Sequence, residues 1–347
     1  MGSEIKVAEL LDAGPDNLVI QDALGKCLQV VRQHDNIMCS VSGGSDSDIM
    51  MDLIMRCGGK EKTTFVFFNT GFEYIATKRQ IKKLEEKYSV QITILPPIKP
   101  IPICVKEYGV PFWSKTVSEY IYRLQRHDFQ WEDEPFDVLL ARYPKCKAAL
   151  RWWCNNWPDK ENGQSSSFNI SYVPWLKEFM MLHPPDFKIS AKCCTYAKKE
   201  VAGKYEKQSN ADLYCTGVRK AEKGARSRSF SSCYSQSIAG PDAYRPLFWF
   251  SDADKAEYDQ HYGVEHSDCY EVWGMRRTGC AGCPFGKEFE IELQLTKKYE
   301  PNFYRAANKI FGKSYEYTRK FLRFREEMNK KRKDGLTPNE EQASFEI

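Results

Sequence analysis

Long apolar runs, an export signal and an excess of charge of one sign are all missing from this sequence. Its 347 residues contain no apolar run approaching the roughly 20 residues that a membrane-spanning helix needs. The segment Met1–Asp12 lacks the basic stretch followed by an apolar stretch that marks a secretory signal. We therefore expect a cytoplasmic protein with no membrane contact. The formal net charge is only +4, so any nucleic-acid contact must be a local patch.

Cysteine, by contrast, is plentiful, with 13 in the chain. In a protein that is not exported these should be mostly reduced thiols, which favours metal or sulfur chemistry over disulfides. The hydrophobic content of 42% over this length allows a large core. Length and composition together predict one large α/β domain with an appended unit.

A stretch rich in glycine and serine separates an apolar run from a segment with helical spacing. The run Ile37–Val41 leads into Ser42–Ser47, which reads Ser-Gly-Gly-Ser-Asp-Ser, and helical spacing covers Ile49–Met55. This order predicts a strand, a loop and a helix. Two glycines let backbone N–H groups approach an anion, and the serine hydroxyls and the helix N-terminus favour negative charge. No lysine follows the glycines, so this is not the phosphate loop of kinases and GTPases.

Strands and helices alternate after the loop. Lys62–Phe68 is a near-continuous apolar run, typical of a strand buried on both faces, and Gln91–Leu95 is the next predicted strand. Between them Ile75–Tyr88 has the charge pattern of a surface helix. This rhythm predicts an α/β fold with a doubly wound, mainly parallel sheet. Along the chain we expect N-terminal helices over residues 1–36, a nucleotide-binding domain over 37–250 with an insertion at about 111–190, and a helical C-terminal region over 251–347.

The glycine-serine stretch resembles the pyrophosphate loop (PP-loop), Ser-Gly-Gly-x-Asp-Ser, of the ATP-pyrophosphatase superfamily, which includes adenylating ligases, tRNA thiolases and sulfonucleotide reductases. Further motifs follow in the order seen in the phosphoadenosine phosphosulfate (PAPS) reductase family. They are Asn69-Thr70-Gly71 with Glu73, Gly217-Val218-Arg219 with Glu222 and Arg226, and Pro246-Leu247 with Trp249 and Asp254. The chain is therefore identified as similar to this family, with an adenine nucleotide α-hydrolase-like fold.

The resemblance implies a nucleotide site made from three segments. The loop would hold the phosphates through Ser42, Gly43, Gly44, Ser45, Asp46 and Ser47, and the second motif would hold the adenosine through Asn69, Thr70, Gly71 and Glu73. Gly217, Arg219, Glu222 and Arg226 would grip a phosphate or sulfate, since arginine forks pair well with such anions. On a helix the two arginines would share a face. Asp46 would coordinate Mg²⁺ if the ligand is ATP.

One phosphate contact differs from the family pattern. Ser45 stands where the related loops commonly have lysine, so a cation from elsewhere is expected to supply that contact. Lys115, in a segment Tyr108–Lys115 that resembles the family near its nucleotide, and Lys223 are the candidates.

Two cysteine pairs give the strongest metal signal. Cys193 and Cys194 are adjacent, and Cys280 and Cys283 form a Cys-x-x-Cys knuckle. Four thiolates hold zinc or an iron–sulfur cluster. Adjacent cysteines point their side chains apart, which suits the spaced corners of a cubane better than one zinc ion. The set is similar to that of a 4Fe-4S cluster in APS reductases, so we expect this cluster, with zinc as the alternative. Cys233 is either a further ligand or a small buried thiol.

Aromatic and basic residues alternate between Tyr108 and Pro185, as in Trp113, Lys115, Arg151, Trp152 and Trp153. Such residues can stack and clamp the bases of an unpaired strand of RNA or DNA. They can also form the core of an insertion whose cations lie on its surface, and we favour this second interpretation.

Three functions are compatible with these motifs. The first is cleavage of ATP between its α and β phosphates, which adenylates a substrate that then receives sulfur with help from the cluster and a sulfur donor. The second is reduction of PAPS or APS to sulfite with a thioredoxin-like reductant; the resemblance requires a nucleophilic cysteine near the C-terminus, and no cysteine follows Cys283 here. The third is a non-catalytic nucleotide or nucleic-acid binding module. The sequence leaves the sulfur acceptor and the oligomeric state open, and favours the first function.

Overall fold

The computed structural model divides the chain into two units, each with its own core. It describes residues 7–157, 169–223, 227, 229–286 and 288–334. The first unit comprises Met1–Pro100, Tyr196–Ala281 and Leu295–Pro301. The second comprises Ile101–Thr195, Gly282–Gln294 and Asn302–Ile347. The N-terminal helices thus belong with the sheet, and residues 251–347 divide between the units.

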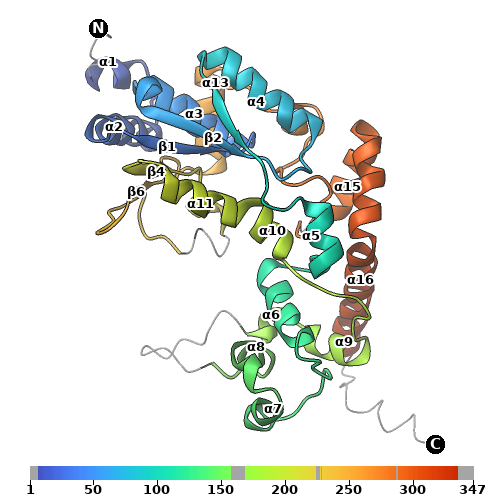
Figure 1. The fold of residues 1–347 in the computed structure, drawn as a ribbon. Coiled ribbons are helices and arrows are strands. Elements are labelled where there is room, and N and C mark those ends of the chain that lie inside the picture. Colours follow the sequence, from blue (N-terminus) through green and yellow to red (C-terminus); the bar gives the residue numbers. More distant parts are fainter. Residues whose placement is uncertain (1–6, 158–168, 224–226, 228, 287, 335–347) are drawn as a thin grey trace, which may run out of the picture. The chain divides into compact units, whose positions relative to one another are not determined.

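A six-stranded sheet in the order β3-β2-β1-β4-β6-β5 forms the centre of the first unit (Figure 1). Every pairing is parallel except that of β5 with β6, which confirms the predicted doubly wound, mainly parallel sheet. The strands are β1 (Ile37–Val41), β2 (Thr63–Phe68), β3 (Ile92–Leu95), β4 (Leu213–Cys215), β5 (Tyr234–Ser235) and β6 (Asp242–Tyr244). The strand order reverses between β1 and β4. The carboxyl ends of strands at such a switch point are where open α/β sheets bind ligands.

Helices cover both faces of this sheet, and Figure 1 shows α4 (Ile75–Tyr88) and α11 (Glu200–Gln208) on opposite sides of it. Three further helices contact one another beside β1: α2 (Leu18–Gln33), α3 (Ser45–Arg56) and α13 (Asp252–Tyr262). Their apolar faces join the buried strands in one core. Local signals set the helix starts. The Asn17 side chain caps α2, and the Ser251 hydroxyl caps α13, as the sequence predicts from a serine directly before the helix expected at Asp252.

The first unit is completed by short helical segments. These are α1 (Val7–Asp12), η1 (Lys60–Lys62), η5 (Lys220–Glu222) and α14 (Asp268–Glu271). Among the described elements, η4 (Thr195–Lys199) and α15 (Phe289–Tyr299) extend across the division of the chain, and α16 (Pro301–Lys333) has only its first residue in the first unit.

The second unit is helical. It contains α5 (Ile101–Tyr108), α6 (Lys115–Gln125), α7 (Phe136–Arg142), η2 (Pro144–Cys146), α8 (Lys147–Trp153), η3 (Ile170–Tyr172), α9 (Leu176–Leu182), α10 (Lys192–Cys194) and α16 (Pro301–Lys333). The helical spacing predicts two helices, Pro301–Phe311 and Tyr315–Lys333, but the structure joins them through Gly312 into the single helix α16. A helical glycine costs only about 1 kcal/mol, and the neighbouring Phe311, Ser314 and Tyr315 are all buried, which keeps the helix continuous.

Aromatic side chains form much of the core of the second unit. Trp152 and Trp153 are at most 1% exposed, and the ring of Tyr120 stacks on Trp152 at 5.3 Å between centroids. Phe179 packs against Tyr317 of α16. For these residues the interpretation as core aromatics is confirmed. The expected exposed loop Glu161–Ser167 lies outside the described residues.

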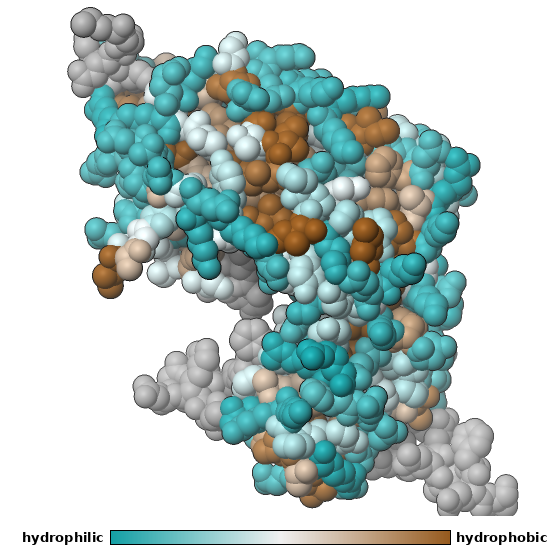
Figure 2. Space-filling model, in the orientation of Figure 1, coloured by the Kyte–Doolittle hydropathy of each residue, from teal (hydrophilic) through white to brown (hydrophobic). Residues whose placement is uncertain are grey.

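The visible surface is mostly hydrophilic, with separate apolar patches (Figure 2). Among the described residues, no helix has both the length and the hydropathy needed to cross a bilayer.

Candidate functional site

The loop after β1 turns sharply into α3 at the carboxyl edge of the sheet. Gly43 has a φ of +66°, a conformation that costs side-chain-bearing residues about 1–3 kcal/mol. A Cβ at this position would also lie 2.9 Å from Thr77 Cγ2 on α4. Glycine is therefore needed here for both backbone conformation and space. The turn directs the N-terminus of α3, with its partial positive charge, toward the pocket described below.

Hydrogen bonds within the loop fix its shape. The Ser47 hydroxyl donates to the Gly44 carbonyl at 2.8 Å and accepts from the Ser42 backbone N–H at 3.1 Å. Ser42 Oγ in turn accepts from the Gly44 backbone N–H at 3.3 Å. These serines therefore hold the loop rather than point outward. The Tyr270 hydroxyl lies against the same turn, where it hydrogen-bonds the Ser45 backbone and, at 3.1 Å, Thr278 Oγ1.

Two cations converge on Asp46, the second residue of α3. Arg219 Nε lies 2.8 Å from Asp46 Oδ1, and Lys255 Nζ lies 2.6 Å from the same oxygen. Lys255 also donates to Ser45 Oγ at 2.7 Å. Both cations are nearly buried, with Arg219 side chain 9% and Lys255 side chain 13% exposed. The phosphate loop is therefore the meeting point of a guanidinium, an ammonium and a helix N-terminus.

Arg219 is placed by the segment that follows β4. Gly217 permits close packing, since a Cβ there would lie 3.2 Å from the Asp46 carbonyl oxygen. The Glu222 carboxylate accepts from the Arg219 backbone N–H at 3.1 Å and so fixes the main chain. Arg219 itself is extended and leads into the single turn η5, which ends at Lys223 with a φ of +53°. Arg219 thus precedes the helical turn instead of lying on a longer helix, and Arg226 lies outside the described residues.

A pocket of about 470 Å³ opens beside these groups. It is lined by Ser45, Arg219, Asp252, Lys255, Ala256, Asp259, His266, Tyr270, Met275 and Arg276. Its charged lining joins the cations Arg219, Lys255 and Arg276 with the carboxylates of Asp252 and Asp259, and Arg276 is exposed. The pocket therefore combines anion-binding groups with the size of a small polar ligand.

A buried chain of three charged groups forms one wall of this pocket. His266 Nδ1 lies 3.1 Å from Asp48 Oδ2, and His266 Nε2 lies 3.0 Å from Asp259 Oδ2. Burial alone would lower the pKa of His266, but its hydrogen bonds with Asp259 and Asp48 raise it to about 9. Burial raises the pKa of Asp48, and the imidazolium opposes that rise. The imidazolium between two carboxylates ties α3, α13 and the segment before α14 together.

The second predicted motif forms a compact turn at the end of β2. The Thr70 hydroxyl donates to Glu73 Oε1 at 2.7 Å, and the Gly71 backbone N–H donates to Asn69 Oδ1 at 2.9 Å. Glu73 is 2% exposed and forms an antiparallel bridge with Cys280. These side chains are largely engaged with their own turn. Their predicted role in adenosine binding stays a prediction.

The four cysteines predicted as metal ligands are divided between the two units. Cys280 is in the first unit, whereas Cys193, Cys194 and Cys283 are in the second. Across the described ranges, no three or more His, Cys, Asp or Glu side chains are grouped so as to hold a metal ion. The four-thiolate site therefore stays a prediction. Cys233 packs partly buried against the core of the first unit, as expected of a small apolar side chain.

Lys115 lies in the second unit, at the first position of α6 after the capping residue Ser114. Its predicted role in phosphate or sulfate binding is untested. In the first unit the cation beside Ser45 is Lys255, which sequence reasoning missed. Nothing local distinguishes this lysine from other charged residues of α13, so only the packing of α13 on α3 identifies it. His266 was missed for the same reason.

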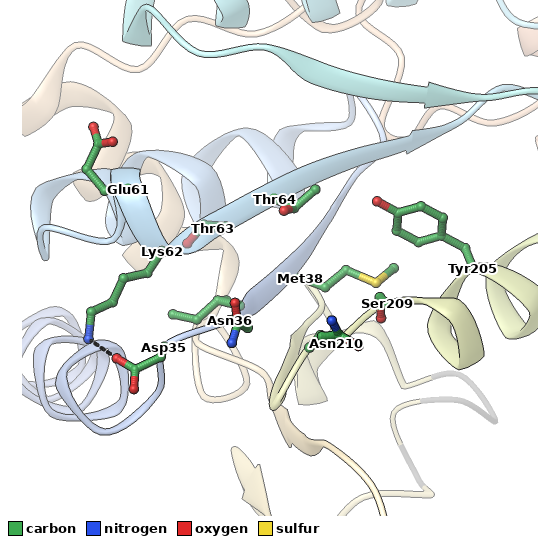
Figure 3. Close-up of a pocket in the computed structure, with 12 residues that line it drawn as sticks. Asp35, Asn36, Met38, Glu61, Lys62, Thr63, Thr64, Tyr205, Ser209 and Asn210 are labelled. Carbon is green, nitrogen blue, oxygen red and sulfur yellow. Dashed lines mark hydrogen bonds and ion pairs between the residues drawn. The ribbon is translucent and has the colours of Figure 1, made fainter.

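A second hollow, of about 310 Å³, lies at the opposite edge of the sheet (Figure 3). It is formed by the amino ends of β1 and β2 and the end of α11, with Met38, Thr64 and Tyr205 on its walls. Lys62 Nζ pairs with Asp35 Oδ1 at 3.0 Å on one side. Parallel sheets bind their ligands at the carboxyl ends of the strands. The pocket beside Ser45 is therefore the candidate site.

Comparison with known proteins finds a family model that matches part of the chain. The family model of the phosphoadenosine phosphosulfate reductase domain matches residues 36–127, which include β1, the loop and α3. No curated protein matches the sequence.

Among solved structures, phosphoadenylyl-sulfate (PAPS) reductase from Candida auris in a phosphate complex is 14% identical, with a TM-score of 0.41 over 81% of this chain and 96% of that one. The NH3-dependent NAD synthetase from Campylobacter jejuni is 10% identical, with a TM-score of 0.35 over 90% and 94%. The U34-tRNA thiolase from Methanococcus maripaludis with its 4Fe-4S cluster is 11% identical, with a TM-score of 0.36 over 89% and 79%. No functional conclusion rests on likenesses this loose. The match over residues 36–127 makes the segment that carries the phosphate loop similar to the phosphoadenosine phosphosulfate reductase domain.

Proposed function

We propose that the first unit binds an adenine nucleotide at Ser42–Ser47 and cleaves ATP between its α and β phosphates to adenylate a substrate. The observation that carries this proposal is the convergence of Arg219 and Lys255 on Asp46 at the N-terminus of α3. Backbone N–H groups and a helix dipole attract phosphate, and two nearly buried cations strengthen that attraction.

Asp46 favours Mg·ATP over a metal-free sulfonucleotide. Arg219 and Lys255 pair with the Asp46 carboxylate, which can still offer an oxygen to a metal ion. Mg²⁺ is held by carboxylate and phosphate oxygens together, so Mg·ATP makes use of Asp46. A phosphosulfate group bound without metal gains nothing from Asp46.

The chemistry requires positioning and charge neutralisation more than proton transfer. An oxygen of the substrate attacks the α-phosphorus, the bond from that phosphorus to the bridging oxygen of the β-phosphate breaks, and pyrophosphate leaves with its negative charge. Arg219 and the N-terminus of α3 hold the charged phosphates, and Asp46 serves the metal. The adenylated oxygen is then activated for displacement by sulfur.

The four cysteines are the proposed ligands for a cofactor of this second step. Thiolates are the donors that a 4Fe-4S cluster or zinc requires, so Cys193, Cys194, Cys280 and Cys283 suit either in their chemistry. A bound cluster would supply sulfur-transfer chemistry. Nucleic acids and small molecules are both candidate sulfur acceptors.

Pyrophosphate release from Mg·ATP tests the proposal. Asp46→Ala should abolish it, whereas Asp16→Ala, a matched change at an exposed aspartate, should leave it unchanged. Circular dichroism checks that both variants fold. Equal pyrophosphate release by wild type and Asp46→Ala would refute the assignment of the loop, and nucleotide binding without turnover would indicate a binding module.

The second candidate function is sulfonucleotide reduction, which the family match over residues 36–127 favours. Release of sulfite from PAPS or APS in the presence of thioredoxin tests it. If the protein releases sulfite and substitution of Arg219 lowers the rate, sulfonucleotide reduction replaces adenylation as the proposed function.

A further inference from the structure

Positive charge is concentrated on the helix α16. Its sequence contains 11 arginine and lysine residues against 3 glutamates, which gives the helix a net charge of +8. The whole chain has a formal net charge of only +4, so the remaining residues together carry −4. A continuous basic run, residues 330–333, ends the helix. The balanced composition of the chain therefore conceals a local surface that attracts anions.

Two tryptophans lie against one face of this helix. Arg325 Cζ is 5.2 Å from the ring centroid of Trp113. Arg332 Cζ is 5.9 Å from the ring centroid of Trp175, whose indole N–H donates to Asn329 Oδ1 at 2.8 Å. The three helix residues recur at helical spacing and so share a face, along which the two arginines are about 10 Å apart. α16 therefore presents two pairs of a ring and a guanidinium in a row.

Both tryptophans have a backbone conformation that is unfavourable for a residue with a side chain. The φ angle is +59° at Trp113 and +66° at Trp175, and such strained residues cluster at functional sites. Trp113 directly precedes Ser114, the cap of α6, and Trp175 is the capping residue of α9, which Figure 1 shows beside α16. Both tryptophans are partly exposed. Strain is thus accepted at two positions that bring an accessible ring to α16.

The guanidinium groups of these pairs are not neutralised by carboxylates. In the part of the chain that the structure describes, Arg325 and Arg332 each contact an aromatic face and neither forms an ion pair. Arg319, earlier on the same helix, instead pairs with Glu290 at 2.6 Å. Arg332 is exposed and Arg325 is partly exposed. The positive charges beside the two rings are therefore available to an anionic partner.

We propose that an unpaired strand of nucleic acid binds along this face of α16, on Trp113, Trp175, Arg325 and Arg332. Such a strand carries flat bases along a chain of phosphates, and the face carries rings that can stack with bases beside cations that can pair with phosphates. A lipid surface or an acidic protein calls for the charge alone. The inference goes beyond the proposed function, because this binding needs neither the phosphate loop nor the cysteines.

Fluorescence anisotropy of labelled oligonucleotides tests the proposal on the full-length protein without ATP. The probes are oligouridylate and oligothymidylate of about 15 nucleotides and a duplex of the same length. At least one single strand should bind more tightly than the duplex, whose bases are already stacked. Preference for one of the two strands distinguishes RNA from DNA as the partner. If neither strand binds at about 100 µM protein, the weak end of non-specific affinities, the proposal is overturned.

Substitution of the two arginines tests where the strand binds. In Arg325→Gln with Arg332→Gln, the loss of two phosphate contacts should lower the slope of log affinity against log salt by about 1.4, which corresponds to about 25-fold weaker binding at 0.1 M salt. Arg305→Gln with Lys309→Gln is the matched control, because it removes the same charge from exposed positions near the other end of α16, and its affinity should match wild type. Equal affinities of wild type and the Arg325 and Arg332 variant would refute this placement.

Trp175→Gly tests the stacking. Glycine adopts the φ of +66° readily, so the change removes the ring without straining the backbone. Single strands should bind about 5- to 150-fold more weakly, as expected for one lost stacked base, and duplex binding should not change. Single-strand affinity equal to that of wild type would show that the ring does not stack. Thermal unfolding checks the fold of the variant, and the arginine variant keeps the test decisive if Trp175→Gly does not fold.

Vesicles that contain phosphatidylserine test the competing partner. The protein should bind them more weakly than it binds the preferred single strand. If it binds them more tightly and the Arg325 and Arg332 variant loses this binding, the face of α16 is a membrane-binding surface and the nucleic-acid assignment is wrong.

Discussion

Lys255 Nζ lies 2.7 Å from Ser45 Oγ, although 210 positions separate the two residues in the sequence. The contact joins α13 to the first turn of α3 and brings an ammonium group to a loop that has no lysine of its own. The packing of α13 on α3 therefore places the Lys255 ammonium beside the loop that is proposed to bind phosphate.

Gly43→Ala should damage the loop. The left-handed backbone at Gly43 and the 2.9 Å approach to Thr77 Cγ2 both disfavour a side chain, so we expect a loss of about 1–3 kcal/mol in the free energy of unfolding, with weaker nucleotide binding. Gly25→Ala is the matched control, because an added Cβ at this position of α2 meets nothing within 4 Å. It should stabilise the helix by about 0.5–1 kcal/mol. Urea unfolding measures both, and a neutral Gly43→Ala would contradict the described turn.

The stability of the first unit should depend on pH through His266. Its folded pKa of about 9 lies above the ordinary value of 6.5, so the imidazolium stabilises the fold fully below about pH 6.5. This contribution, on the order of 3 kcal/mol, is lost as the pH rises through about 9. The groups that face His266 are Asp48, Asp259, the ring of Tyr270 and Glu271, whose carboxylate accepts from the His266 backbone.

His266→Gln tests this pH dependence. The variant should be less stable at neutral pH, and its free energy of unfolding should change less between pH 6.5 and 9 than that of wild type. Denaturant unfolding at intervals of pH gives both curves. Parallel curves for the two proteins would show that His266 does not titrate in this range.

Trp152→Ala should destabilise the second unit rather than weaken a nucleic-acid contact. The side chain is 1% exposed and stacks with Tyr120, so its removal leaves a cavity in the core and should cost about 3–5 kcal/mol. Thermal unfolding measures this loss. Unchanged stability together with weakened RNA or DNA binding would instead favour an interacting surface at this residue.

Metal analysis of anaerobically purified protein tests the cysteine prediction. About four irons with matching sulfide per chain indicate a cubane cluster, and one zinc without colour indicates a structural site. Ser substitution of Cys280 or Cys283 should lower the metal content, whereas Cys154→Ser, outside both pairs, should not. If metal-free protein still releases pyrophosphate at the full rate, the cysteines are not needed for nucleotide cleavage.

The sequence predicted those structural features that depend on residues adjacent in the chain. Glycines between an apolar run and a helical pattern predicted the turn from β1 to α3, and apolar runs predicted the buried strands. Ser251 was predicted as a cap because it directly precedes the helix expected to begin at Asp252, and its hydroxyl accepts from the Asp254 backbone N–H. Each of these features depends on residues that are close together in the sequence, so the sequence alone is enough to predict it.

Features that depend on packing could not be predicted. Lys255 gains its position from the packing of α13 on α3, and His266, which precedes α14, from its contacts with Asp48 and Asp259; no local pattern distinguishes either residue. Arg219 lies directly before the single turn η5, where the Glu222 carboxylate accepts from its backbone N–H, and Arg226 lies outside the described residues, so a helix face shared by the two arginines stays a prediction. The break expected in α16 failed because burial of the residues around Gly312 outweighs the low helix propensity of glycine.

The position at which ATP is cut tests the central claim most directly. ATP labelled in the α-phosphate or in the γ-phosphate is incubated with Mg²⁺ and the purified protein, and the products are separated by anion exchange. Our account predicts that the γ-label appears in pyrophosphate and the α-label in AMP or an adenylated acceptor. Formation of ADP and inorganic phosphate, with the γ-label in the latter, would contradict it.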